Sequence, residues 1–192
     1  LIQHHCYRAD EMAIVLDMAR EFGYKVTAFH HATEAYKIAN LLAENNVCAA
    51  MWADWWGFKM ESYDGIPENA GILYKTGACV VIHSDDANGI QRLNQEAAKA
   101  YYSAKSSGIE ITEQQALQWI TLNAAWALGI DSITGSLDEG KRADVVLWSA
   151  HPFSVYAKAD QVFIDGALVY DRADLGRQPV SDFELGQLQG VQ

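Results

Sequence analysis

Short apolar runs alternate with segments of helical periodicity through the first two thirds of this 192-residue chain. The runs at residues 1–5, 25–29, 47–52 and 79–82 have the length and composition of buried strands. Between them, apolar residues recur three and four positions apart, which is the spacing of one helix face. This alternation predicts βαβ units, in which helices cover a parallel sheet.

Helices are expected at residues 10–22, 34–44, 68–74, 90–108 and 112–129. The last of these opens on Thr112 and Gln115, which fit the capping-box pattern. Glycines at the ends of several segments, such as Gly23 and Gly108, are typical helix stops.

The pattern changes near Ser132. Two strand-like runs, 143–148 and 162–171, follow without an intervening helix, and Asp165-Gly166 predicts a type I′ hairpin turn inside the second run. We therefore expect an α/β region at 1–131, a small β unit at 132–171 and a polar tail at 172–192, whose end we expect to be disordered.

Composition excludes some classes of function. The net charge of -11 argues against a nucleic-acid partner, because phosphate binding requires clustered Lys and Arg. No apolar run reaches 18 residues, so we expect no membrane span. The three cysteines, Cys6, Cys48 and Cys79, lie in apolar surroundings and are predicted to be buried thiols rather than a disulfide framework.

The predicted strands end in histidine. In three of the four runs, the pair at 4–5 ends the first run, the pair at 30–31 follows the second, and His83 follows the last; Asp85 lies two residues beyond His83. For any one histidine, a satisfied position in the core or a loop is the more ordinary interpretation. At three strand ends the coincidence favours a site, because the carboxyl ends of parallel strands are where α/β folds bind ligands. Imidazoles with a carboxylate are typical ligands of Zn²⁺ and similar ions.

An alternative remains open for the stretch after residue 82. The strand would then stop in a solvated turn, with Asp86 or Asn88 capping the next helix.

The spacing of these residues matches a barrel. His5 and His31 are 26 residues apart, and Asp85 follows His31 by 54, or two intervals of 27. A (β/α)₈ barrel uses about 31 residues per βα unit. Ligands on strands n, n+1 and n+3 would therefore face one mouth.

Six segments together resemble the carboxyl-terminal half of a metal-dependent amidohydrolase, similar to imidazolonepropionase-like and Xaa-Pro-dipeptidase-like members. They are "HHCYRADEM", "AFHHATEA", "VVIHSDD", "TLNAAWALGI", "GSLDEGKRADVVLW" and "VFIDGALVYD". The resemblance implies an α/β fold: strands five to eight of a TIM-like (β/α)₈ barrel, then part of a small β-sandwich. Residues 1–131 would form the second half of the barrel, and 132–171 the sandwich portion.

The resemblance also implies roles. His5 and His31 match the family's metal-binding histidines, and Asp85 matches the aspartate that contacts metal and transfers the proton. The divalent metal is expected to be zinc, one or two ions. The family's His-x-His and its bridging lysine have no counterpart here and are expected upstream of Leu1. His4, His30 and Asp86 point elsewhere by strand alternation, as structural neighbours of the ligands.

On this basis the expected function is hydrolysis of a C–N amide, peptide or cyclic amide bond by metal-activated water, with Asp85 as the proton carrier. The alternative is a non-catalytic fragment with an incomplete metal site. A half barrel should pair with its missing amino-terminal half or with itself, because open sheet edges need cover. The partner is a small amide or peptide. The compartment, cytoplasmic or periplasmic, stays open because any targeting segment would belong to the expected missing amino-terminal part.

Candidate substrate-binding residues follow the same strand ends. Tyr7, Arg8 and His83 lie beside the expected ligands, and Arg8 is as readily interpreted as a surface salt bridge. The loop at 53–63 carries Trp55, Trp56 and Tyr63 and is interpreted as a pocket wall, or as a hydrophobic cover over the barrel edge. Of these three aromatic residues, Trp55 is the favoured substrate contact.

Overall fold

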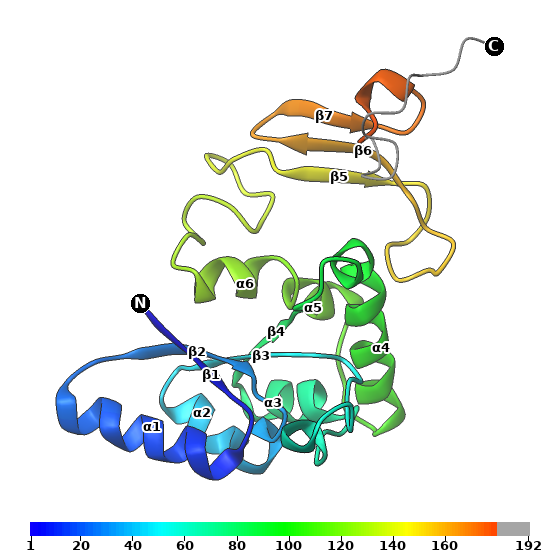
Figure 1. The fold of residues 1–192 in the computed structure, drawn as a ribbon. Helices are drawn as coiled ribbons and strands as arrows, with labels where there is room; N and C mark the ends of the chain where they lie inside the picture. Colours follow the sequence, from blue (N-terminus) through cyan, green and yellow to red (C-terminus); the bar gives the residue numbers. More distant parts are fainter. Residues whose placement is uncertain (180–192) are drawn as a thin grey trace, which may run out of the picture.

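The computed structural model of the chain describes residues 1–179. Its first part is a parallel sheet in the order β1-β2-β3-β4 (Figure 1). The strands are β1 (Ile2–Cys6), β2 (Val26–His31), β3 (Cys48–Met51) and β4 (Cys79–Ile82). Each strand pairs with its neighbour in sequence, and all three pairings are parallel. The α/β class with a parallel sheet is therefore confirmed.

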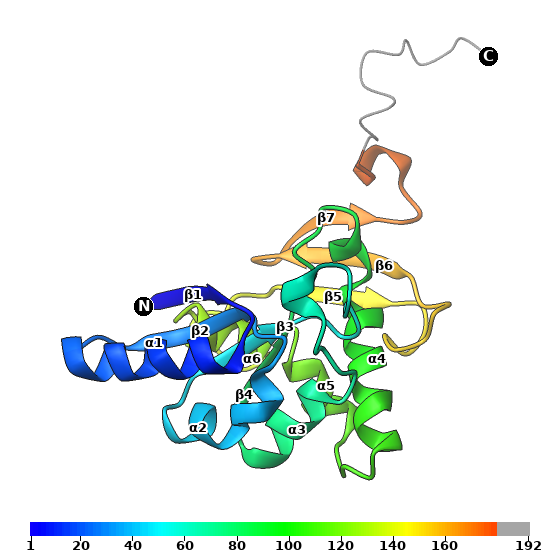
Figure 2. The ribbon, with the colours of Figure 1, turned by 60° about the horizontal axis from the view of Figure 1, so that its bottom comes forward.

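One face of this sheet is covered by helices α1 (Ala9–Phe22), α2 (Ala39–Glu44), α3 (Asn69–Thr76) and α4 (Leu93–Ser106). In Figures 1 and 2, α1, α2 and α3 lie along the same side of the strands. Alternate strand residues such as Phe29, Met51 and Ile82 pack with these helices into the main core. Their burial fixes which side chains remain for the opposite face.

The opposite face is packed by α6 (Leu122–Ala127), which contributes Ala127 to a second cluster with Ala28, Ala50 and Val81. The Gln3 amide donates a hydrogen bond of 3.0 Å to the carbonyl of Ala127. Helix α6 is therefore anchored against the amino-terminal part of the strands.

The structure corrects the prediction for two of the cysteines. Cys48 and Cys79 form a disulfide, and only Cys6 is a free, buried thiol among the described residues. The two residues are direct partners in the β3–β4 register, with Cα atoms 4.3 Å apart. This pairing could not be predicted from the sequence, because it depends on strand register.

The expected helix at 112–129 is two helices, α5 (Glu113–Gln118) and α6. Its start is confirmed, since Thr112 and Gln115 form the complete capping box. It breaks because the carbonyl of Trp119 accepts a hydrogen bond of 3.0 Å from the amide of Ile82 in β4. Similarly, the segment expected as one helix at 34–44 begins as a 3₁₀ turn, η1 (Ala35–Ile38), and α4 is preceded by η3 (Gly89–Arg92).

A second sheet of three antiparallel strands follows: β5 (Val145–Trp148), β6 (Ala159–Ile164) and β7 (Ala167–Asp171). Asp165 and Gly166 both have positive φ, 51° and 80°, which matches the expected type I′ turn. A 3₁₀ turn, η4 (Leu175–Arg177), comes after β7. The tail expected to end in disorder lies, from residue 180 on, outside the described residues.

The domain boundaries at 131 and 171 stay a prediction.

Across residues 1–179, none of the helices combines the length and apolar character that a bilayer crossing requires.

Candidate functional site

The carboxyl ends of β1, β2 and β4 bring three of the predicted site residues together. His5 Nδ1 and His31 Nε2 are within hydrogen-bonding distance, 2.7 Å apart, and the ring centroids are separated by 4.1 Å. Asp85 Oδ2 lies 3.9 Å from the other nitrogen of the buried His31 ring, Nδ1. The Asp85 side chain is 60% exposed, so its carboxylate faces the open side of this cluster.

Irregular backbone produces this convergence. His31, Ala32 and Asp85 have positive φ, at 71°, 41° and 49°. Residues other than glycine seldom adopt this region. Such outliers concentrate at functional sites, because the surrounding structure must hold them in place. Here each one lies where a strand turns into the loop that follows it.

The positions of His30 and His31 correct the prediction made from strand alternation. His30 was predicted to point away from the ligands, yet its ring centroid is 6.0 Å from that of His83, and the centroid of His31 is 5.4 Å from it. Alternation fails because His31 leaves extended geometry. His30 Nε2 is 2.6 Å from Gln3 Oε1. His4 does point to the helix side, 6.1 Å from Phe29 between ring centroids.

Burial keeps two of these histidines neutral. The pKa of His31 falls to about 4, mainly by burial and then by the neighbouring His5 and Lys59, against an opposing effect of Asp85. Burial likewise lowers the pKa of His83 to about 4. Neutral imidazole is the form that binds metal ions. Within the described part of the chain, His31 Nδ1 and His83 Nε2 are buried without a hydrogen-bond partner.

The chemistry of these side chains suits a divalent cation, but the described residues bring too few of them together to hold one. Neutral imidazoles and a carboxylate suit zinc, and the unpartnered Nδ1 of His31 leaves coordinating capacity unused. However, residues 1–179 contain no group of three or more His, Cys, Asp or Glu side chains arranged to hold an ion. His5 and His31 instead share a hydrogen bond. Further ligands would therefore have to come from elsewhere.

The other predicted residues take different positions. The Tyr7 ring stacks on His31, with centroids 4.7 Å apart and planes 8° from parallel. Arg8 makes a bidentate ion pair with Asp10, at 2.9 and 2.7 Å, which matches the surface salt-bridge interpretation. Asp86 accepts a hydrogen bond from the amide of Gly89, so it caps η3.

Sequence reasoning missed two residues of the site. Trp52 stacks on His31 at 4.7 Å and lies 5.0 Å from His83, while its indole N–H donates to the carbonyl of Ser84 at 2.8 Å. Lys59 Nζ lies 4.4 Å from the centroid of the Tyr7 ring. The signal that could have found Trp52 is its position, since it follows the end of β3 just as histidines stand at the ends of the other three strands.

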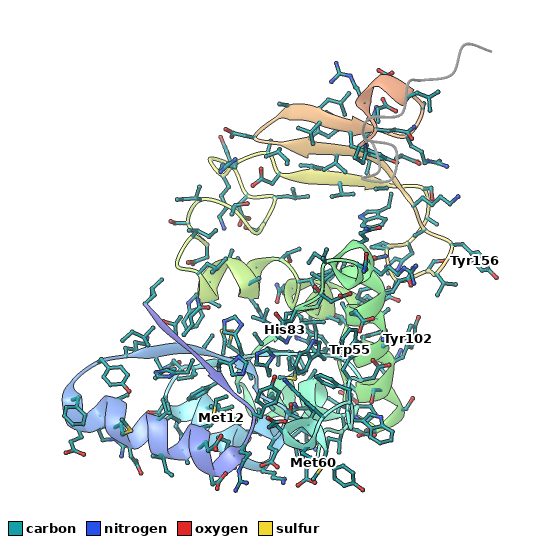
Figure 3. The ribbon with its side chains drawn as sticks, viewed as in Figure 1. Met12, Trp55, Met60, His83, Tyr102 and Tyr156 are labelled. Atoms are coloured by element: carbon teal, nitrogen blue, oxygen red, sulfur yellow. A yellow bond between two sulfur atoms is a disulfide. The ribbon has the colours of Figure 1, made fainter. Side chains whose placement is uncertain are left out.

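The loop between β3 and α3 places its aromatic residues unequally. Trp55 stacks parallel to Trp52 with centroids 6.1 Å apart, and Trp52 in turn lies 5.0 Å from His83; Figure 3 labels Trp55 and His83. Trp56 and Tyr63, by contrast, are 60% and 67% exposed. Of the three loop aromatics named from the sequence, Trp55 is the one joined to the histidine cluster.

Comparison with known proteins agrees with this architecture. The model of a family described as "Amidohydrolase family" matches residues 3–169. The chain belongs to the amidohydrolase family. The amidohydrolase tasK of Hapsidospora irregularis is 30% identical over 175 residues, which are 88% of this chain and 17% of that protein. Imidazolonepropionase of Shewanella frigidimarina is 55% identical over 38 residues, which are 20% of this chain and 9% of that enzyme.

Solved structures show the same relationship. The amidohydrolase from Thermotoga maritima has a TM-score of 0.77 at 32% identity, over 88% of this chain and 43% of that one. An adenosine deaminase from Xanthomonas campestris, with bound zinc, has a TM-score of 0.62 at 22% identity, over 88% and 45%. The chain thus spans less than half the length of each of these four proteins.

Proposed function

We propose that this chain carries the His5, His31 and Asp85 part of a metal-dependent hydrolase that cleaves a C–N amide, peptide or cyclic amide bond with water. The observation that carries the proposal is the convergence of the two imidazoles, 2.7 Å apart, with the carboxylate 3.9 Å from His31. Membership of the amidohydrolase family supports the reaction class.

Each residue has a task in this scheme. His5 and His31 would hold the cation, one or two zinc ions, and Tyr7 and Trp52 fix the His31 ring by stacking on it. A bound zinc ion would acidify a water molecule and polarise the substrate carbonyl. Asp85 accepts a proton from the attacking water and passes it to the leaving nitrogen, for which its exposed carboxylate is suitably free.

We further propose that the four-stranded sheet is half of a (β/α)₈ barrel, strands five to eight, and that β5–β7 are part of a small β-sandwich. Support comes from the consecutive strand order and from the helices that connect successive strands, α1, α2 and α3, which all pack on one face, whereas an open doubly wound sheet reverses its order and places its connecting helices on both faces. Helix α6, on the other face, follows the last strand and connects no pair of strands of this sheet. A partial barrel also explains the partial coverage of longer relatives.

The proposed partners follow from the sheet. Within the described residues β1 and β4 each have one strand neighbour. The other edge of β4 is partly covered, because its Ile82 amide donates to the carbonyl of Trp119 and its Val80 carbonyl accepts from Asn123, while β1 has no strand on its other edge and its backbone donors and acceptors there need cover. We propose that an amino-terminal half of the same protein, or a second copy of the chain, supplies it. The proposed substrate is a small amide or peptide, with no role for nucleic acid.

The alternative proposal is that the chain by itself is a non-catalytic fragment. It is favoured by the absence, in residues 1–179, of a group of three or more metal-binding side chains. A catalytic zinc usually has three protein ligands and a water. Metal content and hydrolysis, measured on the 192-residue chain and on a protein that also holds the missing half, separate the two proposals.

Asp85→Asn tests the catalytic role. Asparagine fills the same space but accepts no proton, so in the protein that also holds the missing half, turnover of an N-acyl amino acid or dipeptide should fall by about 10²–10⁴-fold while the fold is kept. Asp86→Asn is the matched control, because Asp86 caps η3 instead of facing His31. Near-normal turnover of the metal-loaded Asp85→Asn protein would rule out Asp85 as the proton carrier.

Size-exclusion chromatography with light scattering tests the proposal that the sheet edges need a partner. On protein confirmed by mass to contain only these residues, we expect dimers or larger species. A soluble monomer of 21.3 kDa that unfolds cooperatively would refute the half-barrel proposal.

A further inference from the structure

We propose that Lys59, with the aromatic wall formed by Trp52, Trp55 and Phe58, is a subsite for a substrate carboxylate borne next to a large apolar group. This inference rests on the proposed function, since it names the substrate class of that same site. It assigns a binding role to a loop residue that none of the sequence patterns indicated.

Lys59 lies close to the histidine cluster. Its Nζ lies 4.4 Å from the centroid of the Tyr7 ring and 5.2 Å from that of Phe58. Tyr7 in turn stacks on His31 at 4.7 Å. The ammonium group is therefore one aromatic ring away from the candidate catalytic centre, a separation that a substrate substituent a few bonds from the scissile carbonyl can span.

Lys59 differs from other cations near this end of the sheet. Arg8, Lys37 and Lys99 each contact a carboxylate at 2.7–2.8 Å. Among the described residues, no carboxylate oxygen lies within the 4.0 Å ion-pair distance of Lys59. Five other cations also make no ion pair with the described residues, so it is the position of Lys59 over Tyr7, beside the histidine cluster, that distinguishes it.

Aromatic faces hold the ammonium group in place but leave donors free. A cation–π contact is directed at the ring and uses no acceptor lone pair, so N–H groups remain for an anion. The pKa of Lys59 is raised, first by the neighbouring Tyr7 side chain, so the group is charged at neutral pH. A carboxylate would meet a charged donor that is already positioned.

The aromatic wall indicates what accompanies the carboxylate. Trp52 and Trp55 stack 8° from parallel, and the Phe58 ring meets both edge-on, with centroids 5.3 and 6.1 Å away. Trp55 and Phe58 are 39% and 52% exposed, so ring surface is available to a ligand. Burial of a substrate side chain there would add apolar contact to the charge contact. An N-acylated aromatic amino acid with a free carboxylate has both groups.

The test uses binding, so it does not depend on catalysis. The probes are N-acetyl-L-phenylalanine and its amide, measured by titration calorimetry with the intact protein. Wild type should bind the carboxylate at least about tenfold more tightly than the amide, as expected for a charge-assisted hydrogen bond. Lys59→Met should remove that preference without weakening amide binding, and Lys59→Arg should retain most of it. Trp55→Ala should weaken both ligands alike.

Lys99→Met is the matched control, because Lys99 is already paired with Asp54 and Glu96. Circular dichroism checks that each variant is folded. The subsite is refuted if wild type binds the two probes equally or binds neither, or if Lys59→Met keeps the preference for the carboxylate. Failure of the proposed hydrolysis is a separate result: the carboxylate preference would then persist in a protein that turns over no amide.

Discussion

Loss of the disulfide between Cys48 and Cys79 should destabilise the first sheet substantially. The bond joins β3 to β4 on the face opposite the four helices, beside Ala50 and Val81. It closes a chain segment of 31 residues that contains the aromatic loop and α3. Reduction restores the freedom of that segment in the unfolded state while leaving the folded packing nearly unchanged.

The loop length gives the magnitude. A closed loop of this length removes entropy from the unfolded chain equivalent to about 3–4 kcal/mol at 25 °C. That is a large share of a typical stability of about 5–15 kcal/mol. Part of it will be lost if the reduced chain keeps residual structure, so we expect a decrease of about 2–4 kcal/mol in the free energy of unfolding.

Urea unfolding, followed by circular dichroism with and without a phosphine reductant, measures this difference. Cys6→Ala is the control, since Cys6 is a free thiol and its removal should leave the reductant sensitivity intact. Mass spectrometry of protein unfolded and alkylated without reductant should find one modified cysteine. Three modified cysteines, or identical unfolding midpoints in the two conditions, would show that the bond is absent or contributes nothing.

Three further outcomes are expected. Because burial lowers the pKa of His31 and His83 from 6.5 to about 4, the folded state binds fewer protons than the unfolded one in this window. Stability of the metal-free protein should therefore fall as pH drops from 6.5 to 4, by up to about 1.4 kcal/mol per pH unit for each histidine, measured by urea unfolding. Cys6, whose pKa burial raises to about 11, should be alkylated by iodoacetamide at pH 8 about 100-fold more slowly than an ordinary thiol. Gly71→Ala would put a methyl carbon 2.7 Å from Cβ of Ala104, and the overpacking should lower stability by about 1–3 kcal/mol in thermal unfolding.

Much of the architecture could be predicted from the sequence because it rests on local patterns. The strand at 79–82 was predicted with its observed bounds, and the capping box at Thr112 and the turn at Asp165-Gly166 both formed as expected. The convergence of His5, His31 and Asp85 followed from strand ends in a parallel sheet, a rule that needs no knowledge of loops.

What escaped prediction depends on contacts between distant segments. The disulfide depends on the register of β3 and β4, which sets Cys48 opposite Cys79. The break between α5 and α6 at Trp119 comes from a backbone hydrogen bond with Ile82. That His30 and His31 both lie near His83 could not be predicted, because it depends on the positive φ of His31. Lys59 has no motif of its own, since its position over Tyr7 exists only after the loop has folded against β1.

The site therefore divides into two parts with different tolerance to change. His31 and Asp85 hold unfavourable backbone angles at the ends of strands whose neighbouring residues, such as Phe29 and Ile82, are at most 1% exposed. That packing offsets the strain and fixes the groups to which we assign the proposed reaction. Lys59 and Phe58, which is 52% exposed, lie on the loop between β3 and α3, so substitution at these two positions should change the proposed binding preference with little effect on the fold. Substrate preference in this chain should consequently be altered through the loop after β3, while changes at the strand ends remove the reaction itself.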